Sequence, residues 1–382
     1  MMSFFRAVFA VVTLATLSAC RSANDGPAPH SPTPSADAPG VRAEPFATGL
    51  VHPWALAFLP DGRLLVTERP GRMRIVDTTG TLSAPISGVP AVFAEGQGGL
   101  LDVALAPDFS ATQMIYLSFS EPGPEGTAGT AVARGKLVGT TLEGVEVMYR
   151  QRPKLSGTGH FGSRLVFDRE GYLFITQGDR QQYKDSAQSL TAGQGKVVRL
   201  FPDGRVPPDN PFVNQAGALP EIWSYGHRNV QGAALDPVTG RFWTIEHGAR
   251  GGDELNHPEA GKNYGWPVIT YGRDYDFTSI GEGSVKEGME QPVYYWDPVI
   301  APSGMTFYTG DAIPGWKGSL LVAALSPGSL VRLEMQDGHV TNETRYLGAL
   351  NERLRDVAQG PDGFVYVVTD NAEGRVLRIR PQ

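Results

Sequence analysis

The sequence predicts an all-β chain folded as a six-bladed β-propeller with four-stranded antiparallel blades. The 382 residues include 47 glycines and 30 prolines, and no long amphipathic helical stretch is evident. This composition favours short strands joined by turns. A pattern of apolar residues, then a turn with Asp or Gly, then a strand-like run also recurs from Phe58 onward. The recurrence indicates one repeated structural unit.

The repeat occurs six times, at intervals of roughly 45 to 75 residues, which is the spacing of propeller blades. The copies begin at Phe58, Leu105, Val166, Leu235, Met305 and Gly360. Each copy has the form of a β-hairpin, because a turn separates two strand-like runs. Strand repeats without helices are typical of a propeller with one sheet per repeat. Several separate β-sandwiches are the alternative, but they would need linkers between units.

The ring of blades must also close. Residues 42–47 are expected to join the blade made by residues 375–379, which would remove exposed sheet edges. In such a ring, loops from every blade converge on one mouth. Polar residues far apart in the sequence can therefore meet there.

The first 20 residues have the composition of a bacterial lipoprotein signal peptide. A positively charged start and an apolar run lead to Leu17-Ser18-Ala19-Cys20. The run is too short for a transmembrane helix. Cys20 is the only cysteine, and acylation there would anchor an exported, periplasmic protein. A plain cleaved signal peptide with an incidental cysteine is the alternative.

Residues 21–40 are rich in Pro, Ala, Ser and Asp and are expected to form a flexible linker. Residues 41–382 would then form the propeller domain. Arg21 and Ser22 follow the cysteine in place of the Asp that often retains lipoproteins at the inner membrane, which favours the outer membrane. The net charge of −7 argues against a nucleic-acid partner.

The residues that could carry chemistry lie in loops around the predicted strands. His160 follows a glycine-rich stretch and precedes the third repeat. Its proton affinity near neutral pH suits a general base, although a single histidine is more often a core or surface residue. Asp179 ends a strand of the same repeat, and its carboxylate could orient the imidazole or merely cap a turn.

Two further segments suit charged ligands. Arg353 and Arg355 alternate and would point to one face, which suits a ligand with carboxylates or phosphates; a solvated charged edge is the alternative. Residues 248–264 are rich in oxygens and glycines, which suits calcium. The spacing of His247 and His257 does not suit zinc. The sequence contains neither a Walker-type loop nor a Gly-x-Ser-x-Gly elbow.

At these motifs the chain resembles the soluble pyrroloquinoline quinone (PQQ)-dependent sugar dehydrogenases, and most closely their bacterial aldose sugar dehydrogenase branch. The resemblance runs from about residue 43 to residue 379, and the six-bladed propeller of that family agrees with the repeat count. It rests on Gly96-Gln97-Gly98-Gly99-Leu100-Leu101-Asp102-Val103, His160-Phe161-Gly162, Trp223-Ser224-Tyr225-Gly226-His227-Arg228-Asn229, Glu246-His247-Gly248, Arg250-Gly251-Gly252-Asp253-Glu254, Gly261-Lys262-Asn263-Tyr264-Gly265-Trp266-Pro267 and Arg353-Leu354-Arg355-Asp356.

The resemblance implies that this protein oxidises aldose sugars to lactones. His160 matches the base that takes the proton from the anomeric hydroxyl, while a hydride passes from the same carbon to the quinone. Asp179 matches the carboxylate that supports this base. Arg228 and Asn229 match residues at the quinone oxygens, where a fixed cation stabilises the charge that reduction builds.

The resemblance also implies the remaining contacts of the cofactor. Gln97 and Tyr275 match further cofactor contacts, and Arg353 and Arg355 match the pair that grips its carboxylates. The chain has Ser326 where the family commonly has a lysine beside the cofactor, which leaves two alternatives: weaker cofactor binding, or binding in which the two arginines alone carry that charge.

Two calcium ions are implied by the same resemblance. The carbonyls of Gly248 and Ala249 match ligands of a calcium that also touches the cofactor, and Ala249 stands where related chains have proline. Glu254 and the carbonyl of Tyr264 match a second, structural calcium.

Two other functions remain open on the residues alone. A calcium-dependent lactone hydrolase on the same scaffold would need neither Arg228 nor the Arg353 and Arg355 pair. A non-catalytic binding lipoprotein would have no reason to place His160 and Asp179 on converging loops. A dehydrogenase would need an external electron acceptor, because the chain has no Cys-x-x-Cys-His haem motif. The sequence leaves open whether the protein is a monomer or a homodimer.

Overall fold

A computed structural model of the 382-residue chain describes residues 1, 29 and 37–382. The predicted signal peptide, Cys20 and most of the predicted linker lie outside these residues. Within the described residues, no helix has the length and apolar character needed to cross a membrane.

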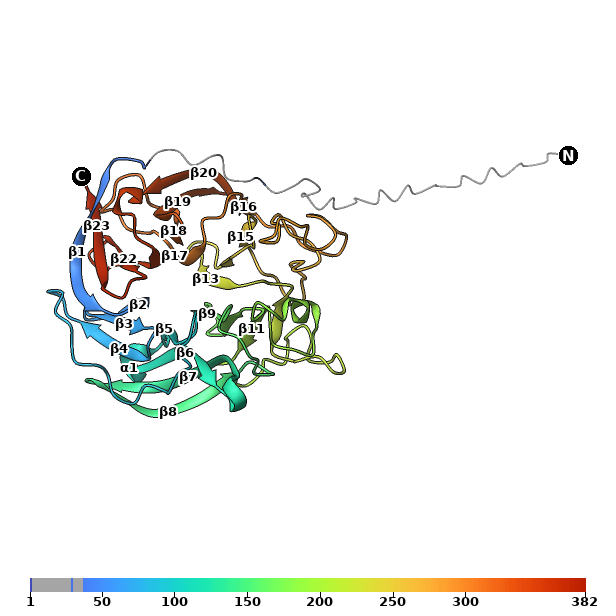
Figure 1. Ribbon diagram of the computed structural model, residues 1–382, viewed down its shortest axis with the longest axis horizontal. Coiled ribbons are helices and arrows are strands. Elements are labelled where there is room, and N and C mark those ends of the chain that lie inside the picture. Colours follow the sequence, from blue (N-terminus) through green and yellow to red (C-terminus); the bar gives the residue numbers. More distant parts are fainter. Residues whose placement is uncertain (2–28, 30–36) are drawn as a thin grey trace.

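Six antiparallel sheets surround a central axis, which confirms the predicted six-bladed propeller (Figure 1). We number the blades in chain order. Blade 1 holds β2 (Pro53–Phe58), β3 (Leu64–Glu68) and β4 (Arg72–Val76). Blade 2 holds β5 (Leu100–Leu105), β6 (Met114–Pro122), β7 (Ala128–Val138) and β8 (Thr141–Arg150). Blade 3 holds β9 (Gly162–Phe167), β10 (Leu173–Gln177), β11 (Lys196–Leu200) and β12 (Ile222–Tyr225).

The second half of the chain forms the other three blades. Blade 4 holds β13 (Val230–Leu235), β14 (Phe242–Glu246), β15 (Asp253–Asn256) and β16 (Tyr294–Trp296). Blade 5 holds β17 (Pro302–Phe307), β18 (Leu320–Leu325), β19 (Gly328–Gln336) and β20 (His339–Tyr346). Blade 6 holds β21 (Leu354–Gln359), β22 (Val365–Thr369), β23 (Gly374–Pro381) and β1 (Val41–Leu50). The short helical segments are α1 (Phe109–Thr112), η1 (Pro124–Gly126), η2 (Lys184–Gln188) and η3 (Gly348–Leu350).

The ring closes as predicted. Strand β1 pairs antiparallel with β23, with Ala43 opposite Ile379, so the start and the end of the domain share blade 6. This pairing covers an edge that would otherwise be exposed. Blade 1 differs from the prediction of four strands, because its sheet has three and only an isolated bridge joins Val76 to Leu82.

Each predicted repeat corresponds to the innermost hairpin of one blade. The six innermost strands share one burial pattern, with four buried residues followed by two partly buried ones. The third residue of each strand therefore occupies an equivalent place beside the central axis. These third residues are Ala55, Asp102, Arg164, Gly232, Gly304 and Asp356.

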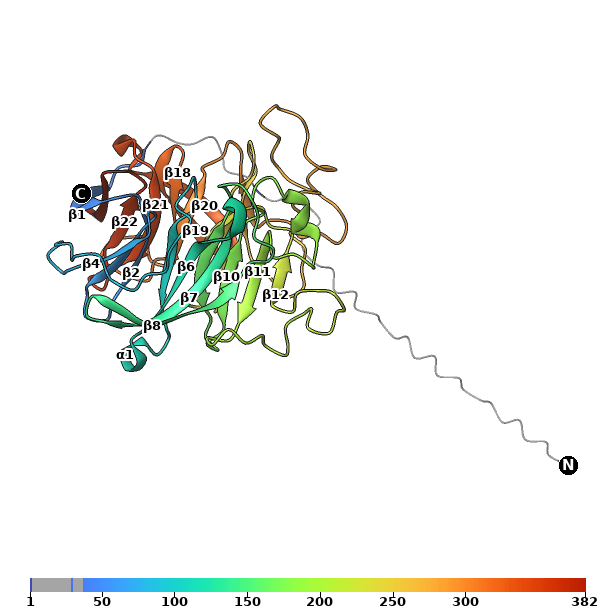
Figure 2. The ribbon, with the colours of Figure 1, turned by 60° about the horizontal axis from the view of Figure 1, so that its bottom comes forward.

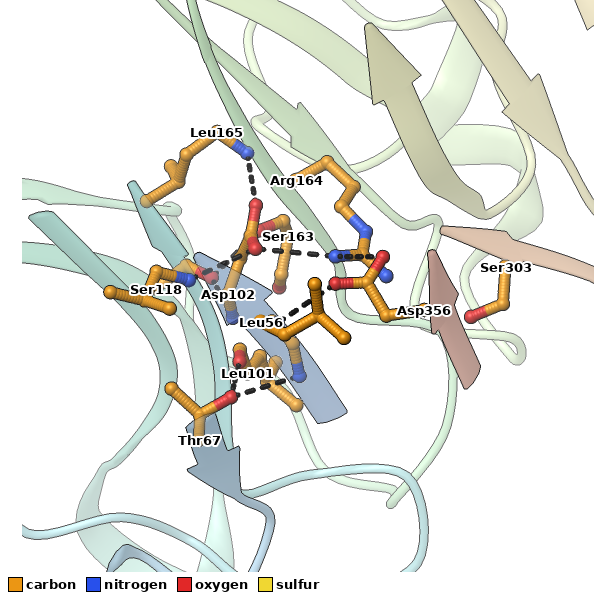
Figure 3. A network of polar contacts seen from close by, with 12 residues as sticks. Leu56, Thr67, Leu101, Asp102, Ser118, Ser163, Arg164, Leu165, Ser303 and Asp356 are labelled. Atoms are coloured by element: carbon orange, nitrogen blue, oxygen red, sulfur yellow. Dashed lines mark hydrogen bonds and ion pairs between the residues drawn. The ribbon is translucent and has the colours of Figure 1, made fainter. Parts of the chain in front are cut away.

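Hydroxyl groups join neighbouring blades near this axis (Figure 3). Thr67 Oγ1 accepts a hydrogen bond from Ala55 N within blade 1 (3.0 Å) and donates one to Leu101 O of blade 2 (2.5 Å). Ser118 makes the same bridge from blade 2 to the Ser163 carbonyl of blade 3 (2.6 Å). Because each hydroxyl satisfies two buried backbone groups, it fixes the spacing of adjacent innermost strands.

Arg164 ties four blades together at the axis (Figure 3). Its Nη1 lies 3.2 Å from Asp102 Oδ1 and 3.1 Å from Asp356 Oδ1, and its Nε donates to the Gln231 carbonyl at 2.6 Å. Gly304 leaves room for the Asp356 carboxylate, because a Cβ added at Gly304 would lie 1.6 Å from Asp356 Oδ1. Burial raises the pKa of Asp102 to about 6, and the Arg164 charge opposes this rise.

Candidate active site at the mouth of the propeller

The candidate residues gather at one end of the innermost hairpins. Innermost strands begin, and their antiparallel partners end, on the same face of the ring. His160 and Arg228 precede the innermost strands β9 and β13, whereas Asp179 and Asp370 follow the second strands β10 and β22. The topology therefore brings together residues that lie far apart in the sequence, such as His160 and Asp370.

His160 and Asp179 form a buried pair. His160 Nδ1 lies 2.7 Å from Asp179 Oδ1, and Trp266 Nε1 donates to Asp179 Oδ2 at 2.8 Å. The backbone of Gln181 also donates to Asp179 Oδ1 at 2.7 Å. Because both carboxylate oxygens are engaged, Asp179 holds the imidazole in one orientation. The predicted pairing of these two residues is present.

The electrostatic surroundings keep this pair as carboxylate and neutral imidazole. Burial lowers the pKa of His160, the hydrogen bond to Asp179 opposes this, and the nearby Arg228 charge lowers it further, for a net decrease. Burial would raise the pKa of Asp179, but the hydrogen bond and charge of His160 and the Arg228 charge lower it overall. With Nδ1–H donating to Asp179, His160 Nε2 carries the lone pair that a base requires.

Gln97 and Asn229 hold the backbone on either side of His160. Gln97 Oε1 accepts a hydrogen bond from His160 N at 2.9 Å, and Asn229 Oδ1 accepts one from Gly162 N at 3.1 Å. Gln97 and Asn229, both predicted to contact the cofactor, thus use their side-chain oxygens to hold the loop that carries His160. The buried Asn229 Nδ2 has no partner among the described residues, and a ligand acceptor could pair with it.

Arg228 lies beside the same pair. Asp179 N donates to the Arg228 carbonyl at 2.8 Å, and the Arg228 guanidinium lies 5.2 Å from the ring centre of Trp266. Its Nη1 donates to the His247 carbonyl at 3.1 Å. Its buried Nε has no hydrogen-bond partner within the part of the chain that the structure describes. A fixed cation therefore stands next to the base.

Arg353 and Arg355 both approach the carboxylate of Asp370. Arg355 Nη2 lies 2.7 Å from Asp370 Oδ2, and Arg353 Nη2 lies 3.4 Å from the same oxygen. Arg69 Nη2 also approaches Asp370 Oδ1, at 3.7 Å. Burial would raise the pKa of Asp370, but Arg355, Arg69 and Arg353 hold it well below its usual range. Among the described residues these three guanidinium groups pair with this one carboxylate, so two of their positive charges have no acidic partner there.

The two predicted arginines differ in accessibility. The side chain of Arg353 is 51% exposed and that of Arg355 only 7%. Arg355 is also held by Gln231 Oε1 (2.7 Å) and Ser303 Oγ (3.3 Å), so its position is fixed before any ligand binds. Arg353 Nη1 lies 3.4 Å from the Leu325 carbonyl, next to Ser326.

Three of the four predicted calcium-binding residues line one small cavity of about 10 Å³: Gly248, Glu254 and Tyr264. Glu246 lines the same cavity. Burial, and then repulsion from Glu246, raise the pKa of Glu254 well above its ordinary value. In residues 37–382 no cluster of three or more His, Cys, Asp or Glu side chains suits a metal. A calcium ion here would therefore depend on backbone carbonyls as well as on Glu254.

Gly248 has no space for a side chain. A Cβ at this position would lie 2.2 Å from the Gly251 carbonyl oxygen and 2.4 Å from that of Gly252. Ala249 forms an isolated bridge with Gly251 in the same loop. The loop is therefore compact, with several carbonyl oxygens close together.

Tyr275 lies apart from the other candidate site residues. It is 63% exposed on the long connection between β15 and β16, which projects beyond the sheets (Figure 2). The described contacts of Tyr275 are local, with its backbone donating to Asp274 Oδ1 at 2.7 Å. Its predicted contact with the cofactor remains a prediction.

Three residues of the site had no role assigned from the sequence: Asp370, which lies outside the quoted motifs, and Glu246 and Trp266, which lie within them. Glu246 accepts hydrogen bonds from His227 Nδ1 (2.9 Å) and Arg228 N (2.5 Å). A signal for two of them was present, because Glu246 ends β14 and Asp370 follows β22, as Asp179 follows β10. With Glu68 at the end of β3, an acidic residue at the end of the second strand thus recurs in four blades.

Comparisons with known proteins agree with this architecture. The profile of the glucose/sorbosone dehydrogenase family matches residues 50–378. The chain is 48% identical over 347 residues to an aldose sugar dehydrogenase of Escherichia coli, covering 90% of this chain and 93% of the relative.

Solved structures give the same result. The soluble aldose sugar dehydrogenase from Escherichia coli in its apo-form is 47% identical, with a TM-score of 0.88 over 90% of this chain and 100% of that one. The PQQ-bound form of an aldose sugar dehydrogenase from Streptomyces coelicolor is 31% identical, with a TM-score of 0.74 over 92% of this chain and 100% of that one.

Proposed function

The chain belongs to the glucose/sorbosone dehydrogenase family, and we propose that it oxidises aldose sugars at the anomeric carbon to lactones, with PQQ as its cofactor. The observation that carries this proposal is the buried His160–Asp179 pair next to Arg228. A base whose free nitrogen is kept unprotonated, beside a fixed cation, is what removal of a hydroxyl proton coupled to hydride loss requires.

The residues present fit a flat, acidic quinone. Arg69, Arg353 and Arg355 pair with only one carboxylate in the described part of the chain, so a ligand with several carboxylates would neutralise their excess charge. Arg228 Nε and Asn229 Nδ2 are buried donors without partners in the described residues, and quinone oxygens are acceptors. Unpaired buried donors cost free energy that a bound acceptor recovers.

His160 acts first in the mechanism. Its Nε2 accepts the proton of the anomeric hydroxyl, and Asp179 stabilises the imidazolium that forms through the 2.7 Å hydrogen bond to Nδ1. When bound, PQQ supplies the acceptor for the hydride that leaves the same carbon. Loss of a proton and a hydride together converts the hemiacetal carbon to the lactone carbonyl.

Arg228 and Asn229 supply the electrostatics of the step. Both side chains are oriented before substrate arrives, because Arg228 Nη1 donates to the His247 carbonyl and Asn229 Oδ1 accepts a hydrogen bond from Gly162 N. Groups that are already oriented need not reorganise as negative charge develops. Arg353 and Arg355 anchor the acidic end of the cofactor, and a calcium ion at Gly248 and Ala249 would add a further positive charge.

One reconstitution experiment tests this function. The purified chain, freed of cofactor, is supplied with calcium and PQQ, and dye reduction is followed with glucose and other aldoses. We expect activity only when both the quinone and an aldose are present. Lactone hydrolysis without the quinone would instead identify a hydrolase, and absence of both activities and of quinone binding would identify a binding protein.

The location of the protein and its electron acceptor are parts of the same proposal. The lipobox-like segment at Cys20 supports an exported, lipid-anchored protein facing the periplasm, with the outer membrane favoured. Two electrons per turnover must leave the site, and the chain has no haem motif to receive them. An external acceptor is therefore part of the proposed cycle.

A further inference from the structure

The loop that carries His160 is held by the buried side chain of Arg180, which is only 1% exposed. Arg180 Nη1 donates to the Gly159 carbonyl, and Nη2 donates to the Gly157 carbonyl at 2.6 Å and lies 3.5 Å from the Leu155 carbonyl. One planar guanidinium thus contacts three carbonyls of the segment immediately before the proposed base.

Arg180 has surroundings unusual for a buried cation. Within residues 37–382 it makes no ion pair with a carboxylate, whereas the similarly buried Arg355 pairs with Asp370 at 2.7 Å. Its guanidinium lies 3.7 Å from the ring centre of Phe161, and its buried Nε has no partner in the described chain. Burial lowers the pKa of Arg180 to about 10, so the group remains charged at neutral pH. Burying a charge that only carbonyls and one aromatic ring stabilise costs folding free energy. Such a residue is therefore a candidate for a functional role.

The backbone of the loop that carries His160 requires stabilisation by contacts from outside the loop. Gly157 has a φ of 93°, and His160 itself has a φ of 51°, which is uncommon for a residue with a side chain. Glycine-rich backbone has many accessible conformations, so the loop on its own would not hold His160 in one place. Arg180 N also donates to the His160 carbonyl at 3.3 Å, which ties the two residues directly.

We propose that Arg180 is a positioning residue for the general base, acting through the carbonyls of Gly157 and Gly159 to hold His160 at its reacting distance. The inference rests on the proposed function of His160 but concerns a residue that does not touch substrate or cofactor. A base displaced by about 1 Å can lose on the order of 10² in rate.

The charge of Arg180 gives a second, separable effect. The charged and titratable groups facing His160 are Asp179, Arg228, Arg180 and His247. Asp179 favours the imidazolium, whereas Arg228 and Arg180 disfavour it. Removing the Arg180 charge should therefore raise the proton affinity of His160.

The test compares Arg180→Met with a matched variant in the same blade. Arg199 is also a buried arginine stacked on aromatic rings, 4.4 Å from Tyr172 and 4.5 Å from Trp223. It lies away from the histidine loop and donates to Asn210 Oδ1 at 2.9 Å. Arg199→Met therefore reproduces the loss of a buried guanidinium without touching residues 155–161.

Three measurements are made on each protein: the thermal stability of the holoenzyme, the dissociation constant of PQQ by titration of the apoprotein, and the pH profile of kcat/KM of the holoenzyme. For Arg180→Met we expect kcat to fall roughly 10- to 100-fold, PQQ affinity to change less than about threefold, and the acid limb to move up by about half a pH unit. For Arg199→Met we expect lower thermal stability. Its kcat should stay within about twofold of the parent, and the acid limb of its pH profile within about 0.2 pH units.

Arg180→Lys separates position from charge and covers the case in which Arg180→Met fails to fold. Lysine keeps the charge but lacks the planar guanidinium that donates to two carbonyls from two separate nitrogens. We expect kcat to fall with an unchanged acid limb. Wild-type kcat in Arg180→Lys, or equal effects of Arg180→Met and Arg199→Met on kcat and on the acid limb, would overturn the proposal.

A readout without turnover distinguishes this proposal from the proposed function. The imidazole of His160, assigned by comparison with His160→Ala, is titrated by nuclear magnetic resonance in the apoprotein. A higher pKa and broadened His160 signals in Arg180→Met, but not in Arg199→Met, support the positioning role even if no sugar is oxidised. Identical His160 titrations in the three proteins contradict it.

Discussion

His160 Nδ1 lies 2.7 Å from Asp179 Oδ1 in a buried pocket that Trp266 completes by donating to the other carboxylate oxygen at 2.8 Å. Three separate segments of the chain therefore define one imidazole orientation and one tautomer. The remaining nitrogen, Nε2, is the group that the proposed reaction uses. This relationship determines the first two predictions.

Replacement of His160 by Ala should remove the general base without removing the cofactor contacts. We expect kcat to fall roughly 10²- to 10⁴-fold, with PQQ affinity within about threefold of the parent. Turnover with a dye acceptor and titration of the apoprotein measure the two quantities. His339→Ala, at an exposed position of β20, is the control and should behave as the parent. Retained turnover in His160→Ala would contradict the assigned role.

Activity should persist below the ordinary pKa of histidine. The base works only when unprotonated, and burial lowers the pKa of His160 below 6.5. The acid limb of kcat/KM should therefore lie below pH 6.5. Because the bond to Asp179 raises the His160 pKa, Asp179→Asn should move the limb to still lower pH while lowering kcat by about 10²-fold. A limb above pH 6.5 in the parent would exclude His160 as this base.

Arg355→Ala should act mainly on cofactor binding. The charge-assisted hydrogen bonds of one guanidinium are worth about 1.5–3 kcal/mol, so we expect the dissociation constant of PQQ to rise by about 10- to 150-fold. Arg378→Ala in the same blade, which removes the 2.9 Å pair with Asp362, is the matched control and should leave affinity unchanged. An effect of Arg355→Ala on kcat alone, at saturating PQQ, would rule out the gripping role.

Calcium should stabilise the folded protein through Glu254. The charge of Glu246 disfavours ionisation of Glu254 and helps to raise its pKa, and a divalent cation would relieve this repulsion. At a calcium concentration of about 100 times its dissociation constant, we expect about 2.7 kcal/mol of stabilisation, seen as a higher Tm that a chelator reverses. Glu254→Gln should lose most of this gain but fold without calcium. An equal calcium response in both proteins would remove Glu254 from the metal site.

Cys20→Ala tests the proposed lipid anchor. If Cys20 is acylated, the full chain expressed in bacteria should incorporate radiolabelled fatty acid and sediment with membranes. The variant should do neither and should appear in the soluble periplasmic fraction. Membrane association that survives the substitution would point to another means of attachment.

Much of the site could be predicted because the repeat fixes where loops emerge. The six hairpin signals located the innermost strands, and His160, Gln97, Asn229 and Arg228 precede such strands. The roles of Asp370 and Trp266 could not be predicted in this way. Each acts through a partner on another blade, Asp370 with Arg69 of blade 1 and Trp266 with Asp179 of blade 3. Such pairings depend on the curvature of the ring, which no local pattern encodes.

The sequence by itself determined the all-β class, the six repeats, the closure of the ring and the residues available at its mouth, because hydrophobic periodicity and turn chemistry are local properties. Only the tertiary structure decided which charges meet. In the structure Arg355 is buried and Arg353 is exposed, yet both pair with Asp370. Arg180 packs against the loop that carries His160. Burial and distance across blades set the strength of these interactions, and both arise only when the ring closes.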